Sequence, residues 1–162
     1  MDKPNGCSVG VIGIGNLLLK DEGVGVHALQ ALAVQLPAHD VKLVDGGTDP
    51  WAALSAVGGC STLLVLDAVT GGKAPGEFHC LSLDEVETRN ASMSLHGLSL
   101  FHLLCYERIL GNGFDDVRVL GMEPAAIEPG VGLSDICRAK LPDFVEMVKS
   151  EIRRVDPGRT LP

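Results

Sequence analysis

The stretch from Gly13 to His27, GIGNLLLKDEGVGVH, places two acids in a glycine-rich turn. Glycines in such a turn let the backbone pass close to a phosphate, which is then bound by N–H groups and positive charge. This turn instead carries Asp21 and Glu22, whose carboxylates would repel a phosphate. The residue types argue against a phosphate ligand and leave open what the two acids do.

Further chemically useful side chains follow two apolar segments. Asp45 is the last residue of DVKLVD, and Asp67 is the last residue of STLLVLD. His96 lies at the start of a later helical pattern. In open α/β sheets, ligands bind beyond the carboxyl ends of the strands. If these segments are parallel strands, we expect Asp45 and Asp67 to converge with Asp21 and Glu22 on one rim.

Each of these residues also has an explanation that involves no function. Asp21 and Glu22 fall in the expected first turn of a helix, where the helix dipole favours carboxylates. Asp67 could accept an Asx-type hydrogen bond in the turn after its strand, and His96 could be a hydrogen-bonded histidine at a helix start. The remaining histidines that we expect to be exposed and without function are His27, His39 and His79.

A nucleotide-binding or other cofactor-binding α/β domain is the main alternative at this point. Gly13 and Gly15 follow a first apolar strand and Asp45 ends the second, which resembles half of a dinucleotide-binding fingerprint. The third glycine position is Leu18, however, and the helical pattern starts too late to point its N-terminus at a pyrophosphate. The chain has neither the H-E-x-x-H motif of zinc proteases nor a G-x-S-x-G motif.

The elements that must position these side chains alternate between strands and helices. Apolar runs and alternation predict five strands: 8–14, 40–47, 61–69, 75–83 and 116–122. Helical spacing predicts four helices: 24–36, 50–57, from about 96 to 109, and 134–155 with a kink or restart at Pro142. For the second of these, Asp49 is the expected N-cap and Pro50 the first helical residue. The connection before 75–83 is too short for a crossover helix, so that strand should run antiparallel. The pattern predicts a three-layer α/β/α fold with a mixed, mostly parallel five-stranded sheet.

Composition limits the partners. The 162 residues include 13 Lys and Arg against 21 Asp and Glu, a net charge of -8. Without a basic face, nucleic acid is not expected as a partner. No apolar run is long enough to span a membrane and no signal peptide is seen, so we expect a cytoplasmic protein. The five cysteines form no C-x-x-C pair, which favours reduced thiols.

Several separate blocks of the sequence resemble the endopeptidases that mature [NiFe]-hydrogenases, the hydrogenase maturation protease family. The blocks occur in order along nearly the whole chain: GIGNLLLKDEGVGVHALQAL, VDGGT, LLVLDAV, SLHGLSL and GMEPAAIEPGVGLS. The resemblance implies a single hydrogenase maturation protease domain over residues 1–162, with a disordered tail from about 156 to 162. One departure is Leu95, where the family often has proline before the histidine.

Carried over to this chain, the resemblance makes Glu22, Asp67 and His96 both the metal ligands and the catalytic residues. Two oxygen ligands and one imidazole suit a divalent ion such as nickel or zinc. The implied ion is nickel supplied by the substrate, for which Zn or Cd can substitute in vitro. The residues expected to line the substrate groove are Asp45, Gly46, Gly47 and Thr48.

The resemblance also implies the activity and its substrate. The expected function is removal of the C-terminal extension of a [NiFe]-hydrogenase large-subunit precursor after nickel insertion, by a metal-dependent or aspartyl-type endopeptidase. The ion could polarise the scissile carbonyl and activate a water, or serve only for recognition and positioning. We expect the protein to be a monomer. A non-catalytic, metal-sensing maturation chaperone that uses the same residues is a second alternative.

Overall fold

The computed structural model describes residues 7–36, 41–89, 91–111 and 113–158. Five strands follow the order β2-β1-β3-β6-β4 across the sheet. They are β1 (Val9–Ile14), β2 (Lys42–Gly47), β3 (Thr62–Thr70), β4 (Phe78–Ser82) and β6 (Asp116–Met122). β1, β2, β3 and β6 are parallel, and β4 is antiparallel to β6. This confirms the mixed, mostly parallel sheet expected from the sequence.

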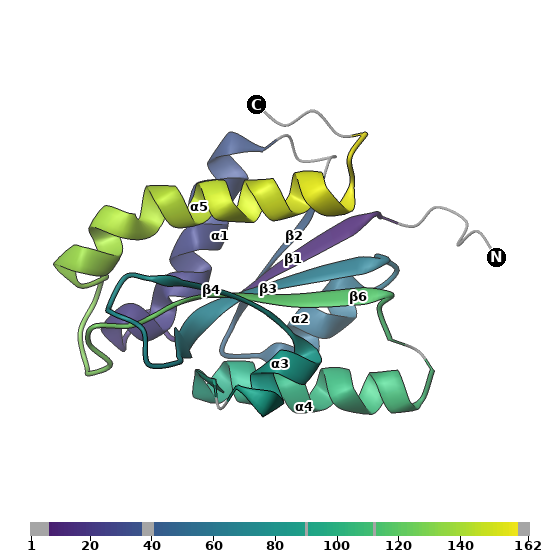
Figure 1. Ribbon diagram of the computed structural model, residues 1–162, viewed down its shortest axis with the longest axis horizontal. Coiled ribbons are helices and arrows are strands. Elements are labelled where there is room, and N and C mark those ends of the chain that lie inside the picture. The colour runs from purple at the N-terminus through teal and green to yellow at the C-terminus, as the bar shows by residue number, and fades with distance from the viewer. Residues whose placement is uncertain (1–6, 37–40, 90, 112, 159–162) are drawn as a thin grey trace.

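Helices cover both faces of this sheet (Figure 1). The helix α1 (Val24–Gln35) and the C-terminal α5 (Asp135–Val155) pack on one face. The other face carries α2 (Pro50–Val57), α3 (Leu83–Thr88) and α4 (Leu95–Ile109). The three-layer α/β/α architecture is therefore confirmed.

The central strand β3 connects the two hydrophobic cores. Successive side chains of a strand point to opposite faces, so Leu64 and Leu66 join the core under α1 and α5. Leu63 and Val65 join the core under α2 and α4. Because both faces of β3 are buried, its sequence is a continuous apolar run rather than an alternating one.

Local capping residues explain where the helices begin. Asp49 Oδ1 accepts a hydrogen bond from the Ala52 N–H at 3.0 Å, and Pro50 is the first helical residue of α2. Both features are as the sequence predicts. Ser94 caps α4 in the same way by accepting the Gly97 N–H at 3.0 Å.

Some elements differ from the sequence prediction. The helix α3 and the two-residue strand β5 (Ser92–Met93), which pairs with the end of β3, were not expected. The prediction that the last helix restarts at Pro142 is wrong, because α5 is a single helix through that residue. Pro142 has no N–H to donate to the Arg138 carbonyl, four residues earlier. Both residues are on the exposed side of α5, where water can replace this missing hydrogen bond.

Two expectations concern residues that are only partly described. Of the tail expected from about residue 156, residues 156–158 follow α5 outside any helix or strand, and 159–162 lie outside the described residues. His39 also lies outside them. Among the described residues, no helix is long and apolar enough to cross a membrane.

Candidate active site

Glycines bring the segment that carries Glu22 against the end of β1. A short 3-10 helix, η1 (Lys20–Gly23), lies between β1 and α1, so Asp21 and Glu22 precede the α-helix rather than form its first turn. Gly15 has a φ of +134°, and a Cβ placed on it would lie 1.9 Å from the Glu22 carbonyl oxygen. Only glycine combines this backbone conformation with such a close approach. The glycine turn thus holds the buried Glu22 beside the end of the sheet.

A second segment holds η1 from the other side. Lys20 has a φ of +48°, which is unfavourable for a residue with a side chain. Its N–H donates to the Gly130 carbonyl at 3.1 Å, and its ammonium group pairs with Glu128. The Gly130 N–H in turn donates to the Leu18 carbonyl at 2.9 Å. The connection between β6 and α5 therefore fixes the strained backbone two residues before Glu22.

Asp21 is the anchor of this second segment. Its fully buried carboxylate accepts the N–H groups of Ala125 (3.0 Å), Ala126 (2.9 Å) and Ser134 (2.7 Å). Burial alone would raise the pKa of Asp21, but these backbone donors outweigh burial and lower it. Asp21 is thus a charged, fully hydrogen-bonded structural group next to Glu22.

Asp67 has the opposite environment. It is 0% exposed, and one carboxylate oxygen, Oδ2, accepts the Ser94 N–H at 2.9 Å. The other oxygen, Oδ1, is buried and has no hydrogen-bond partner among the described residues. Burial, together with the charge of Glu22, raises the pKa of the Asp67 carboxyl to about 8 despite the Ser94 hydrogen bonds. Asp67 and Glu22 are therefore close enough to interact electrostatically.

His96 lies beside Asp67 in the first turn of α4. The adjacent Gly97 would place a Cβ 1.9 Å from Asp67 Oδ2, so a larger residue would displace the carboxylate. Ser94 links the two elements, since its N–H binds Asp67 and its hydroxyl caps α4. The sequence SLHGLSL thus brings the half-buried His96 to the end of β3.

The end of β2 completes this rim. The Gly15 N–H donates to the Gly47 carbonyl at 2.9 Å, which joins the two strand ends. Gly46 is buried, and a Cβ on it would meet Ile14 Cδ1 at 2.6 Å. Asp45 and Thr48 are exposed on either side. The four residues expected to line a groove therefore lie next to the turn that carries Glu22.

Asp67 lies close to Glu22 and is contacted by Ser94 and Gly97 on either side of His96, but the three side chains are not arranged as a metal site. Within the described residues, no group of three or more His, Cys, Asp and Glu side chains is arranged to hold a metal ion. The unpartnered Asp67 Oδ1 is nevertheless the kind of buried acceptor that a cation would satisfy. The donor set of two carboxylates and one imidazole fits a borderline divalent ion.

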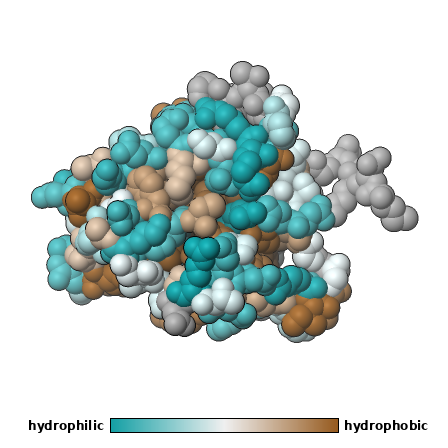
Figure 2. Space-filling model, in the orientation of Figure 1, coloured by the Kyte–Doolittle hydropathy of each residue, from teal (hydrophilic) through white to brown (hydrophobic). Residues whose placement is uncertain are grey.

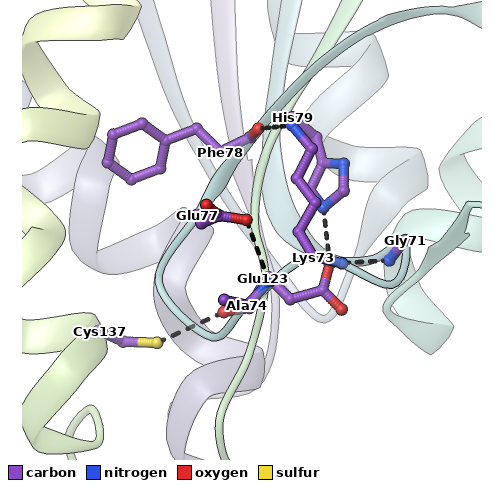
Figure 3. A network of polar contacts seen from close by, with 8 residues as sticks. All are labelled: Gly71, Lys73, Ala74, Glu77, Phe78, His79, Glu123 and Cys137. Atoms are coloured by element: carbon purple, nitrogen blue, oxygen red, sulfur yellow. Dashed lines mark hydrogen bonds and ion pairs between the residues drawn. The ribbon is translucent and has the colours of Figure 1, made fainter.

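A second buried polar network, not anticipated from the sequence, lies beside this rim (Figure 3). Glu123 Oε2 accepts from His79 Nε2 at 2.7 Å and from the Gly71 and Lys73 N–H groups at 2.9 and 3.3 Å. Burial raises the pKa of Glu123, but these donors outweigh burial and lower it. The prediction that His79 is exposed is wrong, because it is buried against Glu123.

This network supports the sheet next to Asp67. In the sheet register, Asp67 pairs with Gly121 of β6, and Gly121 pairs with His79 of β4. Glu123 ties β4 and the loop after β3 to the end of β6. Glu123 is visible in the sequence as the acid of GMEP, but its partner His79 lies far away in the sequence.

The packing at the start of α1 argues against a nucleotide site. A Cβ on Gly25 would lie 2.1 Å from the Leu66 carbonyl oxygen and 2.5 Å from that of Ile14. The helix therefore begins in direct contact with the ends of β1 and β3. Its preceding turn presents buried acids, Asp21 and Glu22, where a phosphate would need donors.

Comparison with known proteins identifies the family of this chain. A family model for hydrogenase maturation proteases matches residues 26–151. The chain is 32% identical over 146 residues to the hydrogenase 2 maturation protease of Escherichia coli, covering 88% of this chain and 89% of that protein. It is 32% identical over 147 residues to the hydrogenase expression/formation protein HoxM of Cupriavidus necator, covering 88% and 73% of the two chains.

Solved structures give the same result for the fold. The hydrogenase maturating endopeptidase HybD from Escherichia coli superposes with a TM-score of 0.80 at 30% identity, covering 91% of this chain and 93% of that chain. The [NiFe] hydrogenase maturation protease HybD from Thermococcus kodakarensis, at 22% identity and a TM-score of 0.72, shares the fold and covers 90% and 99% of the chains. The chain belongs to the hydrogenase maturation protease family, a family of hydrolases.

Proposed function

We propose that this protein removes the C-terminal extension of a [NiFe]-hydrogenase large-subunit precursor once nickel has been inserted. Glu22, Asp67 and His96 would bind the nickel that the precursor carries, and so place the scissile bond on the rim. The observation that carries this proposal is Asp67 at the end of β3, a fully buried carboxylate whose Oδ1 has no hydrogen-bond partner within the described part of the chain. A cation brought by the substrate would supply that partner.

Each of the three side chains is positioned by a different element, η1, β3 or α4. Asp67 is fixed by Ser94 and by the close approach of Gly97. Glu22 is fixed through the backbone by Gly15, while His96 stands at the start of a helix. Protein ligands that leave coordination positions free suit an ion whose other ligands come from the precursor. Zn or Cd supplied in solution would occupy the same donors.

The roles of the neighbouring residues follow from their contacts. Asp21 holds the connection between β6 and α5, and with it the strained Lys20, so it positions Glu22 without touching the substrate. Gly46, Gly47 and Thr48 would line the groove along which the extension lies. Asp45, exposed at the end of β2, would stand at its edge.

Processing of a defined precursor tests this proposal. Nickel-loaded and nickel-free large-subunit precursor would each be incubated with the purified protein, and the product masses measured. We expect cleavage at a single bond of the nickel-loaded precursor, and no cleavage of nickel-free precursor, free extension peptide or casein. Efficient cutting of metal-free precursor in the presence of a chelator would overturn the proposed role of nickel.

The same experiment separates a protease from a metal-sensing chaperone. A chaperone would bind the nickel-loaded precursor without shortening it. Glu22→Gln, Asp67→Asn and His96→Ala variants should retain less than about one part in a hundred of the wild-type rate, because each removes a group that acts at the reaction centre. Asp21→Asn should be milder. Full activity of Glu22→Gln together with loss in Asp21→Asn would reverse the assignment within the pair.

A further inference from the structure

A pocket of about 360 Å³ lined mainly by apolar side chains adjoins the candidate site. It lies between α3, β5 and the start of α4, and we call it the Leu98 pocket. Its lining residues are Val86, Glu87, Ala91, Ser92, Met93, Leu98 and Phe101. None of them is assigned a role in binding the ion or in the groove at the end of β2.

The Leu98 pocket and the candidate site share one stretch of backbone. Met93 lines the pocket, and the next residue, Ser94, donates its N–H to Asp67. A Cβ on Gly97 would lie 1.9 Å from Asp67 Oδ2 and 2.9 Å from Met93 Cε. The Asp67 carboxylate and the pocket wall therefore both pack against Gly97 in the first turn of α4. His96 lies between Met93 and Gly97 in the sequence.

The mouth of this pocket exposes apolar surface to solvent. Leu98 is 43% exposed, and Leu95, one turn earlier on α4, is 72% exposed. Apolar residues gathered around a pocket beside a reaction centre are typical of a site that binds a side chain of the substrate. A substrate polypeptide bound over Asp67 and His96 would lie close to this opening, because Met93 of the pocket wall packs against Gly97, which in turn packs against Asp67.

We propose that the Leu98 pocket binds one apolar side chain of the precursor polypeptide and thereby sets which peptide bond lies over Asp67 and His96. This inference rests on the proposed function and names a specificity subsite for it. The pocket is large enough for a large aliphatic or aromatic side chain. Contact of such a side chain with Val86, Met93, Leu98 and Phe101 would give binding free energy without polar contacts.

Other apolar surface on the same helix provides a control. Ile109, the last residue of α4, is 82% exposed. Figure 2 shows a hydrophobic patch at the lower right, over the C-terminal end of α4. A separate pocket between α2 and the later turns of α4, lined by Trp51, Leu54 and Phe114 among others, shares no residue with the Leu98 pocket. A substitution at Ile109 therefore changes exposed apolar surface without changing the Leu98 pocket.

The test compares Leu98→Glu with Ile109→Glu, in processing of nickel-loaded precursor and in direct binding of the uncleaved precursor. We expect Leu98→Glu to raise KM, and to weaken binding, by at least about tenfold while kcat stays within about twofold. Leu98→Met should restore both values, and Ile109→Glu should match the wild type. Melting temperatures should be similar, because both positions are at the surface.

The outcomes distinguish the pocket proposal from the proposed proteolytic function. If the wild type cleaves and Leu98→Glu has an unchanged KM, the pocket is not a substrate subsite although the proposed function stands. If the wild type binds the precursor without cleaving it, and Leu98→Glu abolishes binding, the pocket stands and proteolysis fails. If the wild type neither cleaves nor binds the precursor, both proposals are wrong.

Discussion

Two buried carboxylates on the same rim, Asp21 and Asp67, differ in how many hydrogen bonds stabilise their charged form. Asp21 accepts three backbone N–H groups and its pKa is lowered. Asp67 has one unpartnered oxygen and a pKa of about 8. The two carboxylates therefore affect stability in opposite ways: Asp21 stabilises the fold, and Asp67 is buried at a cost to stability.

The first prediction at the residue scale concerns Asp67→Asn, which should increase the free energy of unfolding at pH 7 by about 1–3 kcal/mol while abolishing processing. A raised carboxyl pKa means that the folded state keeps a proton which the unfolded state releases, so this penalty grows as pH rises from 3.8 to about 8. The gain from the substitution should vanish below pH 3.8. Urea titrations at pH 3.5, 7 and 8 measure it, and a destabilised variant at pH 7 would contradict it.

For Asp21→Asn the expected sign is opposite. The substitution should lower the free energy of unfolding at neutral pH by about 1–3 kcal/mol, because the N–H donors lose their charged acceptor. The pKa of Asp21 is lowered in the folded state, so its contribution is complete above 3.8 and is lost as pH falls through the folded value. The difference from wild type should thus close on acidification. A difference that persists at low pH would show that the carboxylate charge does not matter.

At the element scale, glycines set how closely helices approach the strand ends. Gly97→Ala should force the Asp67 carboxylate to leave Ser94, since the new Cβ would lie 1.9 Å from Oδ2. We expect processing to fall at least about a hundredfold, because small displacements of a reacting group have large effects on rate. Far-UV circular dichroism should show an intact fold. Gly158→Ala, with open space around its Cβ, is the control and should be indistinguishable from wild type.

A helix or strand could be predicted when the residues that define it are close together in the sequence. The α2 cap depends on Asp49, Pro50 and Ala52, which are close in sequence, and it was predicted correctly. The helix α3 was missed although Ser82 and Glu85 form a capping box, a local signal that was available. β5 has only two residues and no periodicity, so only its pairing with β3 defines it.

The rim itself shows the limit of sequence reasoning. The sequence predicted that Asp45 and Asp67 converge with Asp21 and Glu22, because parallel strands share one carboxyl edge. Of these, the structure brings Glu22, in η1, close enough to Asp67 to raise its pKa. It did not predict that His79 is buried, since its partner Glu123 is 44 residues away. Nor did it predict that the connection after β6 holds Asp21, because those hydrogen bonds involve backbone groups, which carry no residue-specific signal.

At the scale of the whole molecule, the two cores should unfold together because β3 belongs to both. Phe144 is in the core under α5, whereas Trp51, the only tryptophan, is on α2 across the sheet. Phe144→Ala should lower the free energy of unfolding by about 3–5 kcal/mol. The transition seen by Trp51 fluorescence should shift as far as that seen by far-UV circular dichroism. Separate midpoints for the two signals would show that the faces unfold independently.

The contacts of Asp21 also have a consequence for how the protein is made. Its hydrogen-bond partners follow it by 104, 105 and 113 residues. On a ribosome that synthesises the chain from its N-terminus, the glycine turn emerges long before the backbone groups that hold it. A nascent chain that has not yet reached Ser134 cannot close the turn around Glu22. The acidic rim is therefore assembled late in synthesis, when most of the polypeptide has left the ribosome.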